Sequence, residues 1–118
     1  MKKDRILIRD LATEAVIGTL PEERLAAQPL ILNLEIVTDF RAAGASDDLL
    51  DAVDYSQIER TVDKLVRQSQ YFLLESLGEA LCRAVLETPG VDSVTLRIDK
   101  PGAARIARTI GIEMERSR

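Results

Sequence analysis

Apolar and polar residues alternate in four segments of this 118-residue chain, which is the pattern of half-buried β-strands. Residues 4–17 predict a strand pair or one long bent strand. Residues 30–40 predict a long strand with leucine or isoleucine at every second position. Near the C-terminus, residues 94–98 and 106–114 alternate in the same way. They predict two strands joined as a hairpin across a short proline–glycine turn.

Between the second and third of these segments, the apolar spacing changes to three or four residues, as in amphipathic helices. One helix is predicted over residues 55–69, with Asp54 or Ser56 as its N-cap. A second helix is predicted over residues 74–88, and a proline–glycine pair ends it. The small and polar residues 41–48 are expected to form a connection.

The predicted order is β-β-α-α-β-β, with two pairs of strands on either side of a helix pair. This order favours an α+β fold: a four-stranded antiparallel sheet with two helices on one face. A single domain is expected over residues 1–118, because this length supports one core and no linker or repeat interrupts it. Long edge strands pair readily with other chains. An oligomer is therefore expected, in the form of a closed ring whose sheets continue from one subunit into the next.

Charge and composition narrow the possible functions. The net charge is −4 and the basic residues are scattered, which argues against nucleic acid or an anionic membrane as partner. No apolar run approaches the roughly 18 residues of a membrane span. The first residues lack the apolar segment of a signal peptide. The single Cys82 excludes an intramolecular disulfide and fits a cytoplasmic location.

The chain contains no histidine, which restricts the chemistry further. With one cysteine, the usual zinc sites cannot be built within one chain, and Ser-His-Asp triads are excluded. Any catalysis must therefore come from lysine, acidic residues, tyrosine or backbone groups.

Four reactive side chains lie at junctions between predicted elements: Glu23, Tyr55, Glu75 and Lys100. Each has an ordinary explanation, since a glutamate near a helix start interacts with the helix dipole and a strand-end lysine is usually a solvated charge. Glu75 fits its ordinary explanation least well, because large apolar residues flank it and a carboxylate there needs a hydrogen-bonding partner. Lys100 ends a strand at the rim of the sheet, where a partly dry lysine can act as an acid or base.

Several short motifs, in their order and spacing, closely resemble the dihydroneopterin aldolase family of folate biosynthesis. The motifs are Ile17-Gly18 followed by Glu23 and Gln28, then residues 46–49, 51–55, 73–75, 99–103 and 111–116. Together they cover nearly the whole chain. The resemblance implies the tunnelling fold, with sheets joined around a tetrameric ring and two rings stacked into an octamer. It also implies active sites between adjacent subunits.

The resemblance also implies the reaction, a retro-aldol cleavage of 7,8-dihydroneopterin into 6-hydroxymethyl-7,8-dihydropterin and glycolaldehyde. Family members often epimerise the side chain to the dihydromonapterin form as well. An aldol cleavage needs an electron sink, which many aldolases make with a lysine Schiff base or a zinc ion. The dihydropterin carries its own conjugated imine, so no cofactor, metal ion or Schiff base is expected.

By resemblance, three residues are catalytic. Lys100 is the general acid/base, Glu23 holds and helps to activate the trihydroxypropyl side chain, and Tyr55 of the neighbouring subunit takes part in proton transfer there. Glu75 is expected to bind the pterin amino group and the adjacent ring N–H. The substrate-binding residues implied are Glu23, Val53, Tyr55, Leu74 and Glu75, with Leu74 contributing its backbone.

Two departures from the family pattern leave undecided which side chain the pterin substrate carries and whether it is phosphorylated. Residues 19–22 form a loop that varies in the family, and Ile17 stands where many members carry an aromatic residue or histidine. An epimerase acting on dihydroneopterin or its triphosphate therefore remains an alternative, and so does a pterin-binding ring without turnover. Release of glycolaldehyde distinguishes the aldolase from both.

Overall fold

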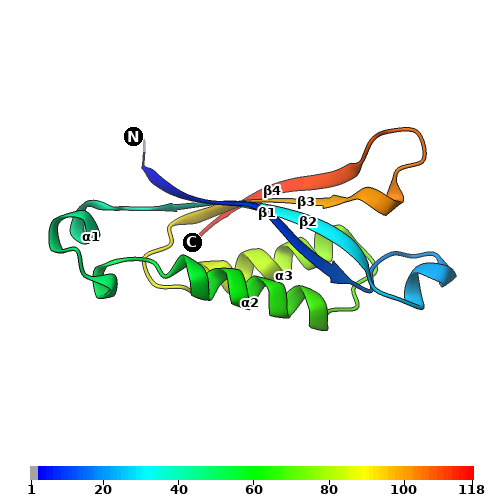
Figure 1. The fold of residues 1–118 in the computed structure, drawn as a ribbon, viewed down its shortest axis with the longest axis horizontal. Helices are drawn as coiled ribbons and strands as arrows, with labels where there is room; N and C mark the ends of the chain where they lie inside the picture. The colour runs from blue at the N-terminus through cyan, green and yellow to red at the C-terminus, as the bar shows by residue number, and fades with distance from the viewer. Residues whose placement is uncertain (1–2) are drawn as a thin grey trace.

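Two helices lie across one face of a twisted four-stranded sheet in the computed structural model, which describes residues 3–118 (Figure 1). The strands and α-helices are β1 (Asp4–Ala15), β2 (Gln28–Thr38), α1 (Arg41–Ser46), α2 (Tyr55–Gln68), α3 (Leu74–Leu86), β3 (Ser93–Lys100) and β4 (Ile110–Ser117). Single turns of 3-10 helix form η1 (Pro21–Arg24), η2 (Leu49–Asp51) and η3 (Pro101–Ala103). The strands lie in the order β1-β2-β3-β4 and all pairs are antiparallel. The predicted α+β architecture is confirmed.

β1 is one strand with a bulge, which decides between the two readings of its sequence. Ile8 pairs with Leu34 and Leu11 with Leu32, so β1 carries one residue more than β2 between these pairs. Asp10, in the bulge, has a φ of 54°, and its backbone N–H donates to Asn33 Oδ1 at 3.0 Å. The extra residue inverts the alternation. Ile8 before the bulge and Leu11 after it therefore both face the core.

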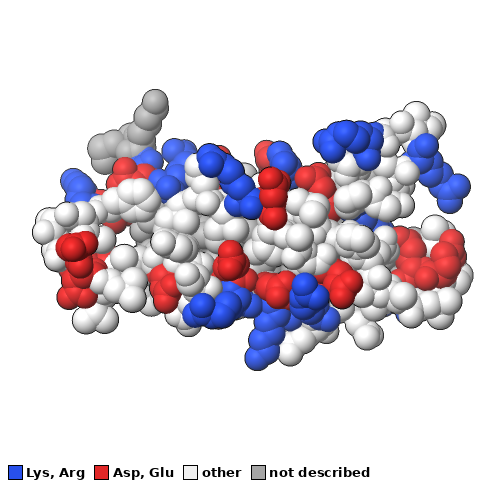
Figure 2. Space-filling model, in the orientation of Figure 1, with Lys and Arg blue, Asp and Glu red and all other residues white. Residues whose placement is uncertain are grey.

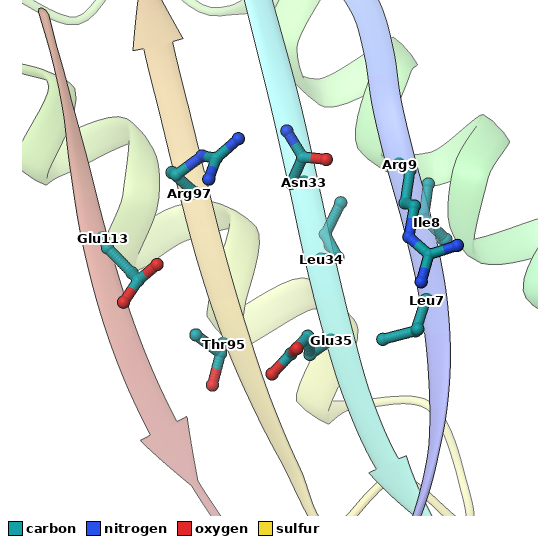
Figure 3. A pocket seen from close by; sticks show the side chains of 9 residues that line it. All are labelled: Leu7, Ile8, Arg9, Asn33, Leu34, Glu35, Thr95, Arg97 and Glu113. Atoms are coloured by element: carbon teal, nitrogen blue, oxygen red, sulfur yellow. The ribbon is translucent and has the colours of Figure 1, made fainter.

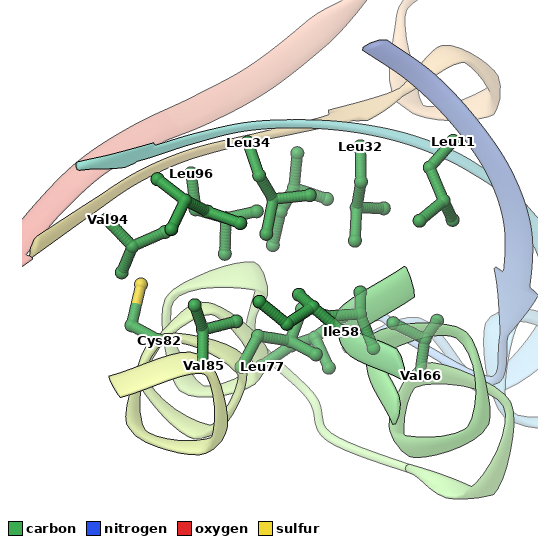
Figure 4. Packing of buried hydrophobic residues seen from close by; sticks show 14 of the residues in the cluster. Leu11, Leu32, Leu34, Ile58, Val66, Leu77, Cys82, Val85, Val94 and Leu96 are labelled. Carbon is green, nitrogen blue, oxygen red and sulfur yellow. The ribbon is translucent and has the colours of Figure 1, made fainter. Parts of the chain in front are cut away.

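The core lies between the sheet and helices α2 and α3 (Figure 4). Alternate residues of β2 and β3 point towards the helices, as the period of two requires. The buried residues of these elements include Leu30, Leu32, Leu34 and Ile36 of β2; Val94, Leu96 and Ile98 of β3; Ile58, Val62 and Val66 of α2; and Leu77, Leu81, Cys82 and Val85 of α3. Asp54 caps α2 by accepting a hydrogen bond from the Gln57 N–H at 3.2 Å.

The structure differs from the sequence prediction at the start of the fourth strand and within the connection 41–48. The fourth strand starts at Ile110 and not at residue 106, because β3 ends at Lys100, whose partner in the ladder is Ile110. Residues 104–109 alternate in sequence but have no strand opposite them. The connection 41–48 is partly helical, since it contains α1.

The other face of the sheet carries polar and charged side chains. Figure 3 shows Arg9, Asn33, Glu35, Arg97 and Glu113 projecting from the four strands around a shallow hollow on this face. Positive and negative side chains are likewise interspersed on the surface drawn in Figure 2. Among the described residues of this face, neither sign of charge forms a continuous patch (Figure 3).

Candidate active site

Lys100 and Glu23 form an ion pair at one end of the sheet. The Lys100 Nζ donates to Glu23 Oε2 at 2.6 Å, across 77 residues of sequence. Lys100 continues the apolar alternation of β3, so its side chain lies on the helix-facing side and is only 8% exposed. A surface charge was the ordinary explanation for Lys100, and its burial is inconsistent with that explanation.

The chain around Gly18 makes room for the Glu23 carboxylate. Gly18 has a φ of 125°, and a Cβ built there would overlap the carboxylate of Glu23. The Leu20 N–H donates to Glu23 Oε1 at 3.2 Å, and Gln28 Nε2 donates to Oε2 at 3.1 Å. Gln28 also donates to the Ile17 carbonyl at 2.6 Å. Backbone and side-chain donors therefore hold the carboxylate from three directions.

These donors keep Glu23 ionised. The hydrogen bonds from Lys100 and then Gln28 lower the pKa of Glu23 from 4.5 to about 2, although partial burial opposes the shift. At neutral pH the carboxylate is therefore an acceptor only. A carboxylate offers about four acceptor positions. Three of them are filled here, which leaves one for a hydroxyl group of a ligand.

Leu74 and Glu75 begin α3 at the same end of the sheet. Gly78, one turn further along the helix, packs close to Ile98 and Ile112. Ile98 lies two residues before Lys100 in β3, and Ile112 lies two residues after Ile110, the ladder partner of Lys100. The first turn of α3 therefore lies beside the strand ends that carry Lys100. Leu74 is half-buried and Glu75 is exposed, so the Glu75 carboxylate is open to a ligand.

Val53 and Tyr55 lie at the opposite end. The hydroxyl of Thr38, the last residue of β2, donates to the Gly90 carbonyl at 2.7 Å, and Val53 lines a hollow with these two residues. Gln28 and Thr38 are ten residues apart, so the two ends of β2 are separated by about 33 Å at the usual rise of a strand. Val53 is nearly buried, whereas Tyr55 is 62% exposed.

The predicted site residues thus fall into two groups within one chain. Glu23, Lys100, Leu74 and Glu75 share one end of the molecule, and Val53 and Tyr55 share the other. The first group alone holds a carboxylate–ammonium pair beside a helix start, which can exchange protons with a ligand and orient it. Tyr55 cannot reach that pair from the same chain.

Three residues of this region were not predicted as site residues. Gln28 and Gly18 were marks of the family pattern only, yet they position the Glu23 carboxylate. Arg24 was not singled out, although its guanidinium joins two loops. A glutamine at the start of an otherwise apolar strand is the sequence signal that could have identified Gln28.

Residues 3–118 contain no cluster of metal-ligand side chains and no helix suited to crossing a membrane. No three acidic or cysteine side chains among them come together in an arrangement suited to a metal ion. Within the same residues, no helix has the length and apolar character of a membrane span.

Comparison with known proteins identifies relatives over almost the full chain. The family model described as FolB, dihydroneopterin aldolase, matches residues 6–115. The FolB structure from Vibrio cholerae is 34% identical and superimposes with a TM-score of 0.95, covering 100% of both chains. An Escherichia coli dihydroneopterin aldolase in complex with neopterin is 30% identical, with a TM-score of 0.92 over 97% of this chain and 99% of that one.

One relative is much longer than this chain, and only a small part of it matches. The folic acid synthesis protein FOL1 of Dictyostelium discoideum is 32% identical over 114 residues. The match covers 97% of this chain but 17% of the Dictyostelium protein. The family resemblance inferred from the sequence motifs is confirmed by these matches.

Proposed function

This chain belongs to the dihydroneopterin aldolase family and has the function of a dihydroneopterin aldolase, and we propose that two neighbouring subunits complete its active site. One subunit supplies Lys100, Glu23 and the start of α3, and the next supplies Tyr55 and Val53. The separation of these groups by about the length of β2 supports this division. The exposure of Tyr55 leaves its hydroxyl accessible to a neighbour.

The substrate is 7,8-dihydroneopterin and the reaction is a retro-aldol cleavage. The bond between the first two carbons of the side chain breaks as the hydroxyl on the second carbon loses its proton and becomes the aldehyde of glycolaldehyde. The released electron pair moves into the imine of the pterin ring, whose nitrogen takes up a proton. The first carbon then takes up a proton while the ring nitrogen releases its own, which restores the imine and gives 6-hydroxymethyl-7,8-dihydropterin. Since the ring is the electron sink, the reaction needs no Schiff base and no metal ion.

The single observation that carries this assignment of roles is the largely buried ion pair of Lys100 and Glu23. The ammonium group of Lys100 supplies and recovers the ring proton, through a bound water. The ionised Glu23 accepts a hydrogen bond from a side-chain hydroxyl at its remaining acceptor position, which orients the bond to be broken. Tyr55 of the neighbouring subunit exchanges the hydroxyl proton.

The pterin ring is held at the start of α3. Glu75 accepts paired hydrogen bonds from the amino group and the adjacent ring N–H, in the geometry by which a carboxylate binds a guanidinium. The backbone of Leu74 adds a further contact. The exposure of the Glu75 carboxylate beside the Lys100–Glu23 pair supports this arrangement.

The open edges of the sheet support a ring-shaped assembly. β1 and β4 each have one unpaired edge, and joining them between subunits closes a ring without leaving edges exposed. We place four subunits in each ring and two rings in an octamer, in the cytoplasm, where the single cysteine stays reduced.

Glycolaldehyde release from purified protein tests the function. We expect stoichiometric glycolaldehyde and hydroxymethyldihydropterin, with full activity after treatment with a chelator. Borohydride added during turnover is expected to leave the enzyme active, since no imine forms on Lys100. Formation of dihydromonapterin without glycolaldehyde would identify an epimerase instead, and loss of activity on chelation or reduction would contradict the proposed chemistry.

A further inference from the structure

Arg24 joins two loops that lie far apart in the sequence. Its Nη1 donates to the carbonyl of Gly18 at 3.1 Å and to that of Tyr71 at 3.0 Å. Its Nη2 donates to the Gln70 carbonyl at 2.6 Å. The guanidinium carbon also lies 4.1 Å from the centroid of the Phe72 ring. One side chain therefore ties the η1 connection to the segment between α2 and α3.

Each loop that Arg24 holds leads directly to a part of the proposed site. On one side, Glu23 is the adjacent residue, and the Gly18 that Arg24 binds packs against the Glu23 carboxylate. On the other side, the segment held at Gln70 and Tyr71 runs into Leu74 and Glu75 at the start of α3. Arg24 thus lies between the acid–base pair and the proposed pterin anchor.

The contacts of Arg24 require the shape of an arginine. A guanidinium presents several N–H donors in a rigid plane and stacks on an aromatic face, whereas an ammonium group is a compact point charge. Within residues 3–118, no carboxylate lies at ion-pair distance from Arg24. Its donors are used on backbone carbonyls, which fixes the path of the chain and does not neutralise a charge.

We propose that Arg24 is a positioning residue, which holds the Lys100–Glu23 pair at the distance from the pterin anchor that carbon–carbon bond cleavage requires. The inference rests on the proposed function, because it concerns the relative placement of two parts of that site. Glu75 is built on a helix packed onto the core, whereas Glu23 lies in a short connection without buried residues of its own. Loss of Arg24 therefore displaces Glu23 more than Glu75.

The test compares Arg24→Met and Arg24→Lys with a matched control, Arg83→Met. Arg83 is an exposed arginine in the last turn of α3. The measurements are kcat for glycolaldehyde release, the dissociation constant of 6-hydroxymethylpterin, which lacks the trihydroxypropyl tail, and folding by circular dichroism. We expect kcat to fall about 10- to 100-fold in both Arg24 variants, as for a reacting group displaced by about an ångström. The affinity for the tail-less pterin is expected to stay within about threefold of wild type.

The control separates positioning from general stability. Arg83→Met is expected to keep wild-type kcat and affinity. Full kcat in Arg24→Met, with or without a lower melting temperature, would overturn the inference. So would a loss of tail-less pterin affinity equal to the loss of kcat, since the whole site would then depend on Arg24. If Arg24→Met does not fold, Arg24→Lys alone is the test, by the same comparison of kcat with the affinity for the tail-less pterin.

The wild-type assay distinguishes the two levels of the proposal. Wild-type protein that releases no glycolaldehyde would overturn the proposed function, and the inference with it. Active wild type beside Arg24 variants with unchanged kcat would overturn the inference alone.

Discussion

Lys100 is the last residue of the buried alternation of β3, and this position gives it an environment that a surface lysine lacks. It follows Val94, Leu96 and Ile98 on the side of the sheet that faces the helices. Its ammonium group is thus kept from bulk water and is held at 2.6 Å from a carboxylate. A proton donor in such a place needs little reorganisation when a reacting group arrives.

Replacing Lys100 by alanine removes the proposed acid/base group and leaves the proposed pterin anchor at α3 intact. We expect kcat for glycolaldehyde release to fall about 10²- to 10⁴-fold, the usual contribution of a general acid or base. The dissociation constant of 6-hydroxymethylpterin, measured by titration calorimetry, is expected to change by less than about threefold. Weakened pterin binding with normal turnover at saturation would remove Lys100 from this role.

The Glu23 carboxylate links the stability of the protein to acid pH. Its pKa is about 2 when folded, against 4.5 as the ordinary value. The ionised Glu23 therefore contributes its full stabilisation of the folded state above about pH 5. This contribution is lost as the pH falls towards 2. Between pH 6 and pH 3 the loss is about 2 kcal/mol, from the difference between the two pKa values.

Urea unfolding of wild type and Glu23→Gln, at one protein concentration, measures this linkage. The free energy of unfolding of wild type is expected to fall by about 2 kcal/mol more than that of the variant between pH 6 and pH 3. Parallel pH dependence in the two proteins would mean that Glu23 is not the ionised, hydrogen-bonded group described above.

At the scale of elements, the first turn of α3 is the proposed pterin anchor. Glu75→Ala is expected to weaken pterin binding by roughly 2–4 kcal/mol, because paired hydrogen bonds to a charged acceptor are lost. Calorimetry with 6-hydroxymethylpterin measures the change. Glu87→Ala at the far end of the same helix is the control, and it is expected to bind as wild type does. Equal affinity of Glu75→Ala and wild type would place the anchor elsewhere.

The regular elements were predictable because each follows one period of apolar residues. The stripe of Ile58, Val62 and Val66 identified α2, and the alternation of β2 identified the central strand. The bulge in β1 was not predicted, although the apolar alternation changes phase between Ile8 and Leu11, because the same change also fits two separate strands. The start of β4 was misplaced since alternation in sequence does not reveal where the partner strand ends.

Part of the site followed from the sequence and part did not. Glu23 and Lys100 were predicted from motifs, and the structure brings them together. Arg24 and Gln28 act through contacts with carbonyl groups and a carboxylate distant in sequence, and no periodicity encodes such contacts. The roles of these two residues could therefore be identified only from the three-dimensional structure.

At the scale of the whole molecule, a chain 52 Å long carries complementary parts of one proposed site at its two ends. The Lys100–Glu23 pair lies at one end and Tyr55 at the other, so a single subunit does not bring Tyr55 to the ion pair. In the proposed ring, each interface is expected to bring Lys100 and Glu23 of one subunit to Tyr55 of the next. Each subunit then contributes to two sites.

Complementation between two inactive variants tests this central claim most directly. Lys100→Ala and Tyr55→Phe are each expected to be nearly inactive as pure proteins. When the two are co-expressed in equal amounts and assemble at random, about one interface in four combines an intact Lys100 with an intact Tyr55. We predict about a quarter of the wild-type kcat per site in the mixed protein. Activity no higher than that of the pure variants, in oligomers shown by mass spectrometry to contain both chains, would contradict a site shared between subunits.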